Sequence, residues 1–154
     1  MSKLAPGEPA PGFSLPDQDD VVVALDDFAG RRVVVYFYPA DDTPGCTKEA
    51  CQFNDRLEEF AGAGTEVLGI SPDGAQSHRR FRERYGLSVR LLSDLDRSVM
   101  ERYGAWGEKT LYGRTSVGVI RSTFLVGPDG NVEQAWYNVR ADGHAAKVLD
   151  LVRS

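Results

Sequence analysis

The chain has 154 residues, of which 42% are hydrophobic, 10% aromatic and 27% charged. This length predicts a single domain over residues 1–154, with a core large enough to fold without disulfides or a structural metal. The net charge of -5 argues against the basic surface of a protein that binds nucleic acid or an anionic membrane.

Neither a targeting segment nor a membrane span is expected. Residues 1–12 contain one lysine and no apolar run, unlike a signal or transit peptide. No apolar stretch approaches the roughly 20 residues needed to cross a bilayer. We therefore expect a cytoplasmic protein. In that compartment a close pair of cysteines is more often catalytic or metal-binding than structural.

The apolar residues divide the chain into alternating strands and helices. Residues 4–12, with three prolines and two glycines, predict an extended arm. The continuous apolar run 33–38 predicts a strand buried on both faces of a sheet. The other predicted strands are 13–15, 21–25, 65–70, 89–92, 119–126 and 132–137. The predicted helices are 46 to 62 or 64, 75–85, 96–103 and 144–152, with a turn at 26–30 and a glycine-rich loop at 104–118.

This order of elements indicates the fold class. Alternating strand and helix units, followed by a hairpin and a closing helix, imply a mixed central sheet with helices on both faces. With an N-terminal β-hairpin, the expected organisation is the α/β thioredoxin-like fold.

Both cysteines of the chain lie where the apolar strand 33–38 gives way to a helix. Cys46 stands at the predicted helix start, after Pro44 and Gly45. The first N–H groups of a helix are unpaired and carry partial positive charge, which favours a thiolate over a thiol. Thr43 could place its hydroxyl beside the sulfur, or could instead cap the helix.

The spacing of the two cysteines bears on their chemistry. On one helix, residues five apart point about 140° away from each other, with Cα atoms roughly 8 to 9 Å apart. A disulfide needs Cα atoms within about 7 Å, so Cys46 and Cys51 could bond only if the helix unwinds locally. A redox cycle fits this spacing better than a structural disulfide. Two alternatives stay open: a pair of inert small hydrophobes, and a zinc site, which lacks further soft ligands because His78 and His144 lie in unrelated segments.

At this segment the sequence resembles a known family. Pro39, Thr43 and Cys46 follow the pattern Pro-x-x-x-Thr-x-x-Cys, and the run TPGCTKEAC is similar to the active-site segment of peroxiredoxins of the PrxQ, or bacterioferritin comigratory protein, subfamily. The likeness extends to residues 10–15, 103–109, 121–126 and 143–145. The chain departs from the family pattern at Asp20, where a glycine is usual in the hairpin turn.

The resemblance implies a complete site. Cys46 would be the peroxidatic cysteine, Cys51 the resolving cysteine, Thr43 and Arg121 the residues that bind and polarise the peroxide, and Pro39 a shield of the pocket. The implied enzyme reduces hydrogen peroxide and alkyl hydroperoxides through a Cys46 sulfenic acid and a Cys46–Cys51 disulfide, which thioredoxin recycles. No cofactor or metal is implied, and the protein would act in antioxidant defence as a monomer.

Neighbouring residues receive simpler expectations. Asp41 and Asp42 should oppose ionisation of Cys46 by like-charge repulsion unless they point into solvent. Glu49 is expected as a partner of the helix dipole or of Lys48 or an arginine.

Four aromatic residues are expected to be structural. His78 is predicted on solvated helix surface, His144 in the first turn of a helix, and Trp106 and Tyr112 in the core.

Two other classes of function remain. A thiol-disulfide oxidoreductase of thioredoxin type needs C-x-x-C spacing, which this chain lacks, and a non-catalytic binding module would leave Cys46 dispensable.

Overall fold

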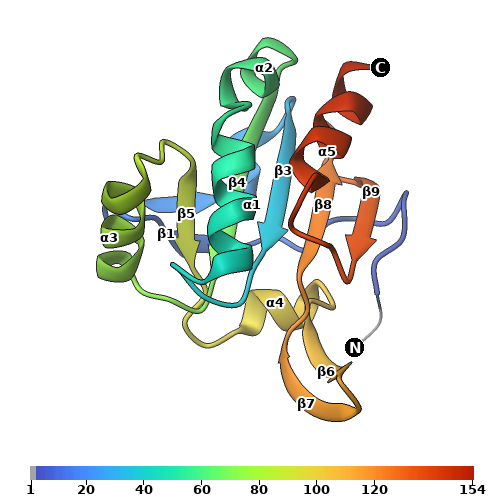
Figure 1. Ribbon diagram of the computed structural model, residues 1–154. Helices are drawn as coiled ribbons and strands as arrows, with labels where there is room; N and C mark the ends of the chain where they lie inside the picture. Colours follow the sequence, from blue (N-terminus) through green and yellow to red (C-terminus); the bar gives the residue numbers. More distant parts are fainter. Residues whose placement is uncertain (1–2) are drawn as a thin grey trace.

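The computed structural model describes residues 3–154, which are built around a mixed sheet of five strands (Figure 1). In spatial order the strands are β5 (Arg90–Ser93), β4 (Thr65–Ser71), β3 (Arg32–Phe37), β8 (Ser122–Val126) and β9 (Val132–Tyr137). β3, β4 and β5 are parallel, whereas β8 runs antiparallel to β3 and β9 antiparallel to β8. The sequence-based expectation of a mixed central sheet is confirmed.

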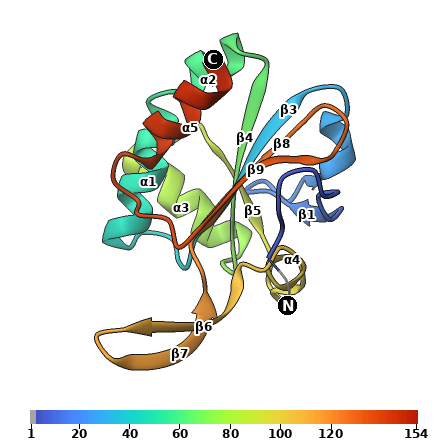
Figure 2. The same cartoon turned by 90° about the vertical axis from the view of Figure 1, so that its right-hand side faces the viewer.

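Helices cover both faces of this sheet. One face carries α1 (Pro44–Asn54), α3 (Ala75–Tyr85) and α5 (His144–Arg153), while α4 (Ser98–Arg102) and the N-terminal hairpin lie on the other (Figure 2). The thioredoxin-like α/β fold predicted from the element order is thereby confirmed. No helix within residues 3–154 has the length and apolar character needed to span a membrane.

The central strand β3 is the centre of the core. Val33, Val35 and Phe37 pack into a cluster on one face, and Val34 and Tyr36 pack into a second cluster on the opposite face. Each of these five side chains is at most 1% exposed. This double burial explains why the sequence of β3 is continuously apolar instead of alternating.

Cys46 belongs to the second of these clusters. It packs there with Ala50 and Phe53 of α1, whose buried face repeats every three to four residues. The ring of Phe53 stacks on that of Tyr36, with centroids 4.6 Å apart. The same apolar face that attaches α1 to the sheet therefore holds the thiol against the end of β3.

The predicted helix from residue 46 to 62 or 64 is wrong in its extent. The segment forms two helices, α1 and α2 (Leu57–Gly62), which are interrupted at Arg56, where φ is -114° and ψ is 7°. The Arg56 guanidinium donates a 2.8 Å hydrogen bond to the carbonyl of Gln52 in the last turn of α1, which satisfies a carbonyl near the helix end. α1 also begins at Pro44, so Cys46 is its third residue.

The predicted loop at 104–118 is wrong. It contains an antiparallel hairpin of β6 (Trp106–Leu111) and β7 (Arg114–Val119), which projects away from the sheet on the side that carries α1 (Figures 1 and 2). Tyr112 at its tip is 95% exposed, so its expected core position is also wrong, whereas Trp106 packs half-buried against the first cluster. Because most of this hairpin buries no face, its sequence shows no alternation of apolar and polar residues.

The N-terminal hairpin is confirmed despite the missing glycine. Strands β1 (Ser14–Pro16) and β2 (Val22–Ala24) pair antiparallel. Asp20 adopts φ of 60° in the intervening turn, and the Asp17 carboxylate accepts hydrogen bonds from the amides of Asp19 and Val21. Aspartate tolerates the left-handed region better than most residues, so Asp20 adopts the conformation expected of glycine. The turn predicted at 26–30 is largely a short 3-10 helix, η1 (Leu25–Phe28).

Candidate active site

Cys46 lies in the first turn of α1. Thr43 occupies the N-cap position, Pro44 follows as the first helical residue, and the first helical hydrogen bond runs from the Thr47 amide to the Thr43 carbonyl at 2.8 Å. The amides of Gly45 and Cys46 precede this bond. The positive end of the α1 dipole is thus directed at the sulfur region, as the sequence indicated.

A guanidinium contacts the sulfur directly. Arg121 Nη2 donates to Cys46 Sγ at 3.3 Å, and Arg121 Nη1 donates to Glu49 Oε1 at 2.6 Å. Arg121 lies between β7 and β8, 75 residues from Cys46 in the chain. Burial opposes the charge of the guanidinium, but the nearby Glu49 and Cys46 raise the pKa of Arg121 overall. Arg121 is therefore a permanent cation beside a thiol that is only 2% exposed.

Glu49 is the most unusual acid in the described chain. Its side chain is fully buried one turn after Cys46, and Oε2 has no hydrogen-bond partner within residues 3–154. Burial raises the pKa of Glu49 to about 7, although Arg121 acts in the opposite direction. The arginine partner anticipated for Glu49 is Arg121.

Gly45 allows the guanidinium to approach the helix start. A Cβ atom added at Gly45 would lie 3.2 Å from Arg121 Nη2. Such a contact is tight, so the guanidinium would have to shift by a few tenths of an ångström to accept a side chain here. The reason for a glycine at position 45 is therefore the close approach of Arg121, and not a positive φ angle.

Thr43 and Pro39 lie in the loop between β3 and α1. The Thr43 hydroxyl donates to the Ala40 carbonyl at 2.9 Å and does not cap α1. Of the two alternatives for this hydroxyl, side-chain capping is therefore excluded. Pro39 follows Tyr38 at the end of β3 and is half-buried.

Cys51 lies on the same helix but in a different environment. It is half-buried and lines a groove of about 620 Å³ between α1 and the C-terminal end of α3. Burial, and secondarily the charge of Asp55, raise the pKa of Cys51. Both cysteines are free thiols, and both lie within an intact α1.

The AhpC/TSA family model matches residues 6–135 of the chain. The chain belongs to the AhpC/TSA family. A relative from Mycobacterium tuberculosis is 55% identical over 147 residues, which are 96% of this chain and 94% of the relative. Peroxiredoxin Bcp of Escherichia coli is 45% identical over 153 residues, covering 99% of this chain and 98% of that protein.

Solved structures give the same assignment. Peroxiredoxin Q of Xanthomonas campestris aligns with a TM-score of 0.86 and 40% identity over 92% of this chain and 89% of that chain. Peroxidoxin BcpB of Mycobacterium tuberculosis aligns with a TM-score of 0.85 and 35% identity over 97% of each chain. The chain is thus one of the Bcp and PrxQ peroxiredoxins, as its motifs indicated. It is a thiol peroxidase, which acts on a peroxide and takes electrons from a thiol reductant.

The structure places the two aspartates near Cys46 differently and overturns the expectation for His78. Asp41 does not point into solvent, because its buried carboxylate lies 2.7 Å from His78 Nδ1. His78 is 0% exposed and not on solvated surface. It stands three residues before the buried Phe81 on α3, a spacing that could have indicated burial. Asp42 pairs with Arg84 at 2.7 Å on the surface.

His144 is the first residue of α5, as expected, but it is also buried beside the site of the peroxiredoxin. Its Nε2 lies 2.9 Å from Thr123 Oγ1. Burial, followed by the charges of Lys147 and Arg121, lowers the pKa of His144 to about 4. The imidazole is therefore neutral at physiological pH.

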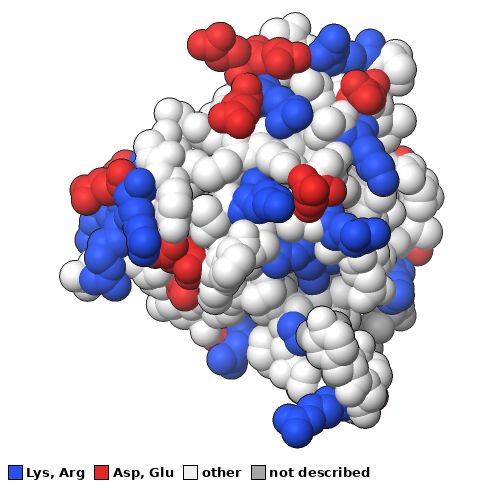
Figure 3. All heavy atoms as spheres, in the orientation of Figure 1, with Lys and Arg blue, Asp and Glu red and all other residues white. Residues whose placement is uncertain are grey.

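Basic side chains gather on the surface beside α1. Figure 3 shows them in the middle of this face, with an acidic group among them. The pKa of Asp142 reports this positive charge. It is lowered by a hydrogen bond from Gln52 of α1 and by the nearby charges of Lys48 and Arg140. Although the chain as a whole is acidic, the surface near the thiols thus includes positive charge, which favours anions there.

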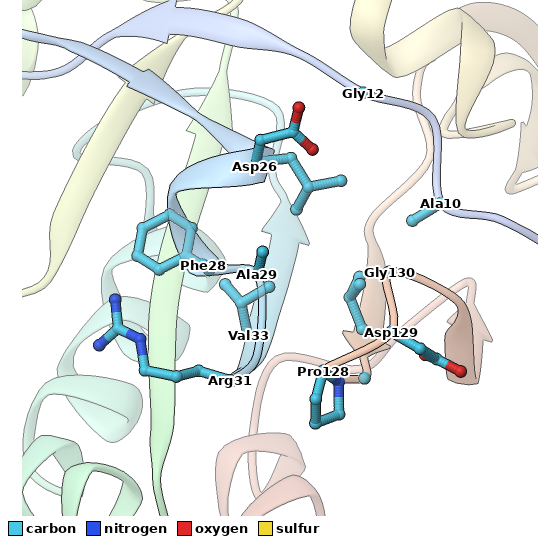
Figure 4. Close-up of a pocket in the computed structure, with 13 residues that line it drawn as sticks. Ala10, Gly12, Asp26, Phe28, Ala29, Arg31, Val33, Pro128, Asp129 and Gly130 are labelled. Atoms are coloured by element: carbon cyan, nitrogen blue, oxygen red, sulfur yellow. The ribbon is translucent and has the colours of Figure 1, made fainter.

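A second cavity lies far from the thiols. It has a volume of about 230 Å³ and lies between η1 and the turn at 127–130 (Figure 4). Val33, at the start of β3, lines it, whereas the Cys46 loop follows the end of β3. This cavity is therefore separate from the surroundings of Cys46 and Cys51.

Proposed function

We propose that this peroxiredoxin reduces hydrogen peroxide and organic hydroperoxides to water and alcohols through a Cys46 sulfenic acid and a Cys46–Cys51 disulfide. The observation that carries the proposal is the 3.3 Å contact between Arg121 Nη2 and Cys46 Sγ, where the sulfur is buried in the first turn of a helix. A guanidinium and first-turn amides both stabilise a thiolate, the nucleophilic form of cysteine.

In the first step the Cys46 thiolate attacks one peroxide oxygen along the O–O bond. That bond breaks, and the sulfur keeps the attacked O–H as a sulfenic acid. The second oxygen leaves as hydroxide or alkoxide and takes a proton from solvent to become water or alcohol. Arg121 stabilises the negative charge that passes from sulfur to the leaving oxygen. The Thr43 hydroxyl proton is already donated to Ala40, which supports a role for its oxygen as the acceptor for the peroxide O–H. Pro39 shields the pocket from water.

In the second step the thiolate of Cys51 attacks the sulfenic sulfur, a disulfide forms, and water leaves. The two residues lie five apart within α1, which corresponds to Cα atoms roughly 8 to 9 Å apart. A disulfide requires a shorter separation. The proposed cycle therefore includes local unwinding of the first turns of α1.

In the third step an external dithiol reduces the disulfide by exchange, and we propose thioredoxin as that dithiol. The groove at Cys51 supports attack on the Cys51 sulfur. The thiolate expelled is then Cys46, whose charge Arg121 stabilises, and a stabilised thiolate is the better leaving group. We further propose that the protein works as a cytoplasmic monomer in antioxidant defence, with no cofactor in its cycle.

The test is peroxide consumption in the presence of thioredoxin, its reductase and NADPH. Cys46→Ser should abolish turnover. Cys51→Ser should consume one equivalent of peroxide and then stop, because the sulfenic acid still forms and lacks its resolving thiol. Full turnover by Cys46→Ser would refute the peroxidatic role, and steady turnover of Cys51→Ser with thioredoxin would refute the resolving role.

The same assay separates the two other classes of function. A non-catalytic binding module would show no peroxide consumption in the wild-type protein. A thioredoxin-type oxidoreductase would reduce protein disulfides instead of peroxide.

A further inference from the structure

The carboxylate of Asp41 is buried and accepts several hydrogen bonds. Oδ1 accepts from the Tyr38 hydroxyl, and Oδ2 accepts from the Ser77 hydroxyl at 2.8 Å and faces His78 Nδ1 at 2.7 Å. The Asp41 side chain is only 3% exposed. A buried carboxylate is tolerated when hydrogen-bond donors surround it, and this arrangement supplies them.

The partners of His78 define its protonation. His78 Nε2 lies 3.0 Å from the carbonyl oxygen of Leu92, which can only accept a hydrogen bond, so Nε2 carries a hydrogen. Nδ1 faces the Asp41 carboxylate. Because two acceptors cannot meet at 2.7 Å without a hydrogen between them, a hydrogen bond joins Nδ1 and the Asp41 carboxylate. His78 thus links Asp41 to the Leu92 carbonyl through both ring nitrogens.

This hydrogen-bonded pair attaches one loop to the rest of the fold. Asp41 belongs to the loop that connects β3 to α1, two residues before Thr43, while His78 belongs to α3 and Leu92 to β5. The Asp41 amide also donates to Asp73 Oδ2 at 2.7 Å in the turn after β4. The loop before Cys46 is therefore anchored to three elements of the fold.

None of the hydrogen bonds of Asp41 within residues 3–154 involves α1. Unwinding the first turns of α1, as in the proposed cycle, would leave the Asp41–His78 pair intact. The anchored loop and the unwinding helix meet at Thr43 and Pro44. The structure thus separates a fixed segment from the helix that follows it.

We propose that Asp41 and His78 are positioning residues for Cys46. The pair holds the loop that carries Thr43, so that the start of α1 and the Thr43 hydroxyl return to the same geometry when α1 refolds after each turnover. This proposal rests on the peroxidase cycle described above and adds two residues that contact neither peroxide nor sulfur. Displacements of about 1 Å in a catalytic group can lower a rate by about a hundredfold.

The variants are Asp41→Asn, which keeps the shape but places an amide among donors, and His78→Phe, which keeps a ring but removes both donors. The measurements are the single-turnover rate constant of Cys46 with hydrogen peroxide and the pH profile of Cys46 alkylation. We expect each variant to lower the rate constant by about tenfold or more and to shift the alkylation profile to higher pH. The double variant should be no slower than the slower single variant, because both changes disrupt one unit.

Asp150→Asn is the matched control, since Asp150 is exposed on α5 and should retain the wild-type rate and profile. Circular dichroism and thermal unfolding show whether the variants fold. If they do not, Ser77→Ala removes one donor to Asp41 and should show a smaller decrease in the same rate.

The proposal would be overturned if a folded variant (Asp41→Asn, His78→Phe or Ser77→Ala) kept the wild-type rate constant and pH profile. Additive losses of rate in the double variant would also overturn it. Such results leave the peroxidase cycle untouched, because that cycle is tested by Cys46→Ser against the wild-type protein. Failure of the wild-type protein to consume peroxide would instead refute the cycle.

Discussion

The fully buried carboxylate of Glu49 accepts a 2.6 Å hydrogen bond from Arg121, and the same guanidinium donates to the Cys46 sulfur at 3.3 Å. Glu49 therefore orients Arg121 and also competes with the thiolate for its positive charge. The second carboxylate oxygen of Glu49 has no partner in the described chain. The protonation of this acid should thus affect both the stability of the protein and the site.

Glu49 should make stability depend on pH. Its pKa in the folded protein is about 7 against an ordinary value of 4.5, so between these values the folded state binds more protons than the unfolded state. Stability is then lost as the pH rises from about 5 to 8, by up to about 3 kcal/mol. Glu49→Gln cannot ionise and should lack this loss.

Urea unfolding of wild type and Glu49→Gln at pH 5, 6, 7 and 8 checks the sign. The free energy of unfolding of the variant relative to wild type should rise with pH over this range. A constant difference between the two proteins would contradict a raised pKa of Glu49 in the folded state.

Replacing Arg121 should separate its charge from its shape. Arg121→Gln removes the cation and should lower the rate constant of Cys46 with hydrogen peroxide by about a hundredfold or more. Arg121→Lys keeps the charge but not the planar guanidinium that contacts both Cys46 and Glu49. Its rate constant should therefore lie between those of Arg121→Gln and the wild-type protein. Stopped-flow single-turnover measurements give these constants. Equal rates for lysine and wild type would show that charge alone suffices.

Gly45→Ala should disturb the site with little effect on the fold. The added Cβ would lie 3.2 Å from Arg121 Nη2, so the guanidinium would have to shift by a few tenths of an ångström. We expect this shift to lower the rate with peroxide by about tenfold. Gly62→Ala in α2 is the matched control, because its Cβ would have no neighbour within 4 Å. It should leave the rate unchanged and raise stability by up to about 1 kcal/mol. Similar rates for both variants would argue against close packing at Gly45.

Disulfide formation should unwind the start of α1. In the oxidised protein, amides at residues 46–51 should exchange with solvent faster than in the reduced protein, because a helix cannot hold the two cysteines close enough. The loop 38–43 should keep its protection, since Asp41 is held by α3 and by Asp73. Hydrogen exchange detected by mass spectrometry measures both segments, with peroxide-treated Cys51→Ser as the control that forms no internal disulfide. Unchanged exchange at 46–51 after disulfide formation would contradict unwinding.

Local sequence patterns were sufficient to predict those helices and strands that bury a continuous apolar face. The apolar run of β3, the helical spacing of Ala50 and Phe53, and the position of Cys46 near a helix start were all readable from neighbouring residues, and the structure agrees. The β6–β7 hairpin was missed because most of it projects from the sheet and buries no face, so no periodicity marks it.

Contacts between distant segments were decided only by the tertiary structure. The approach of Arg121 to Cys46 spans 75 residues, and the pairing of His78 with Asp41 spans 37. Composition and periodicity carry no information on which charged groups meet, so the sequence predicted His78 on solvated surface where the fold buries it against Asp41. The elevated pKa of Glu49 likewise depends on burial by the surrounding core. The sequence determined that a thiol stands at a helix start, because the local order of strand, loop and helix is encoded by neighbouring residues. Packing determined which charged groups surround that thiol.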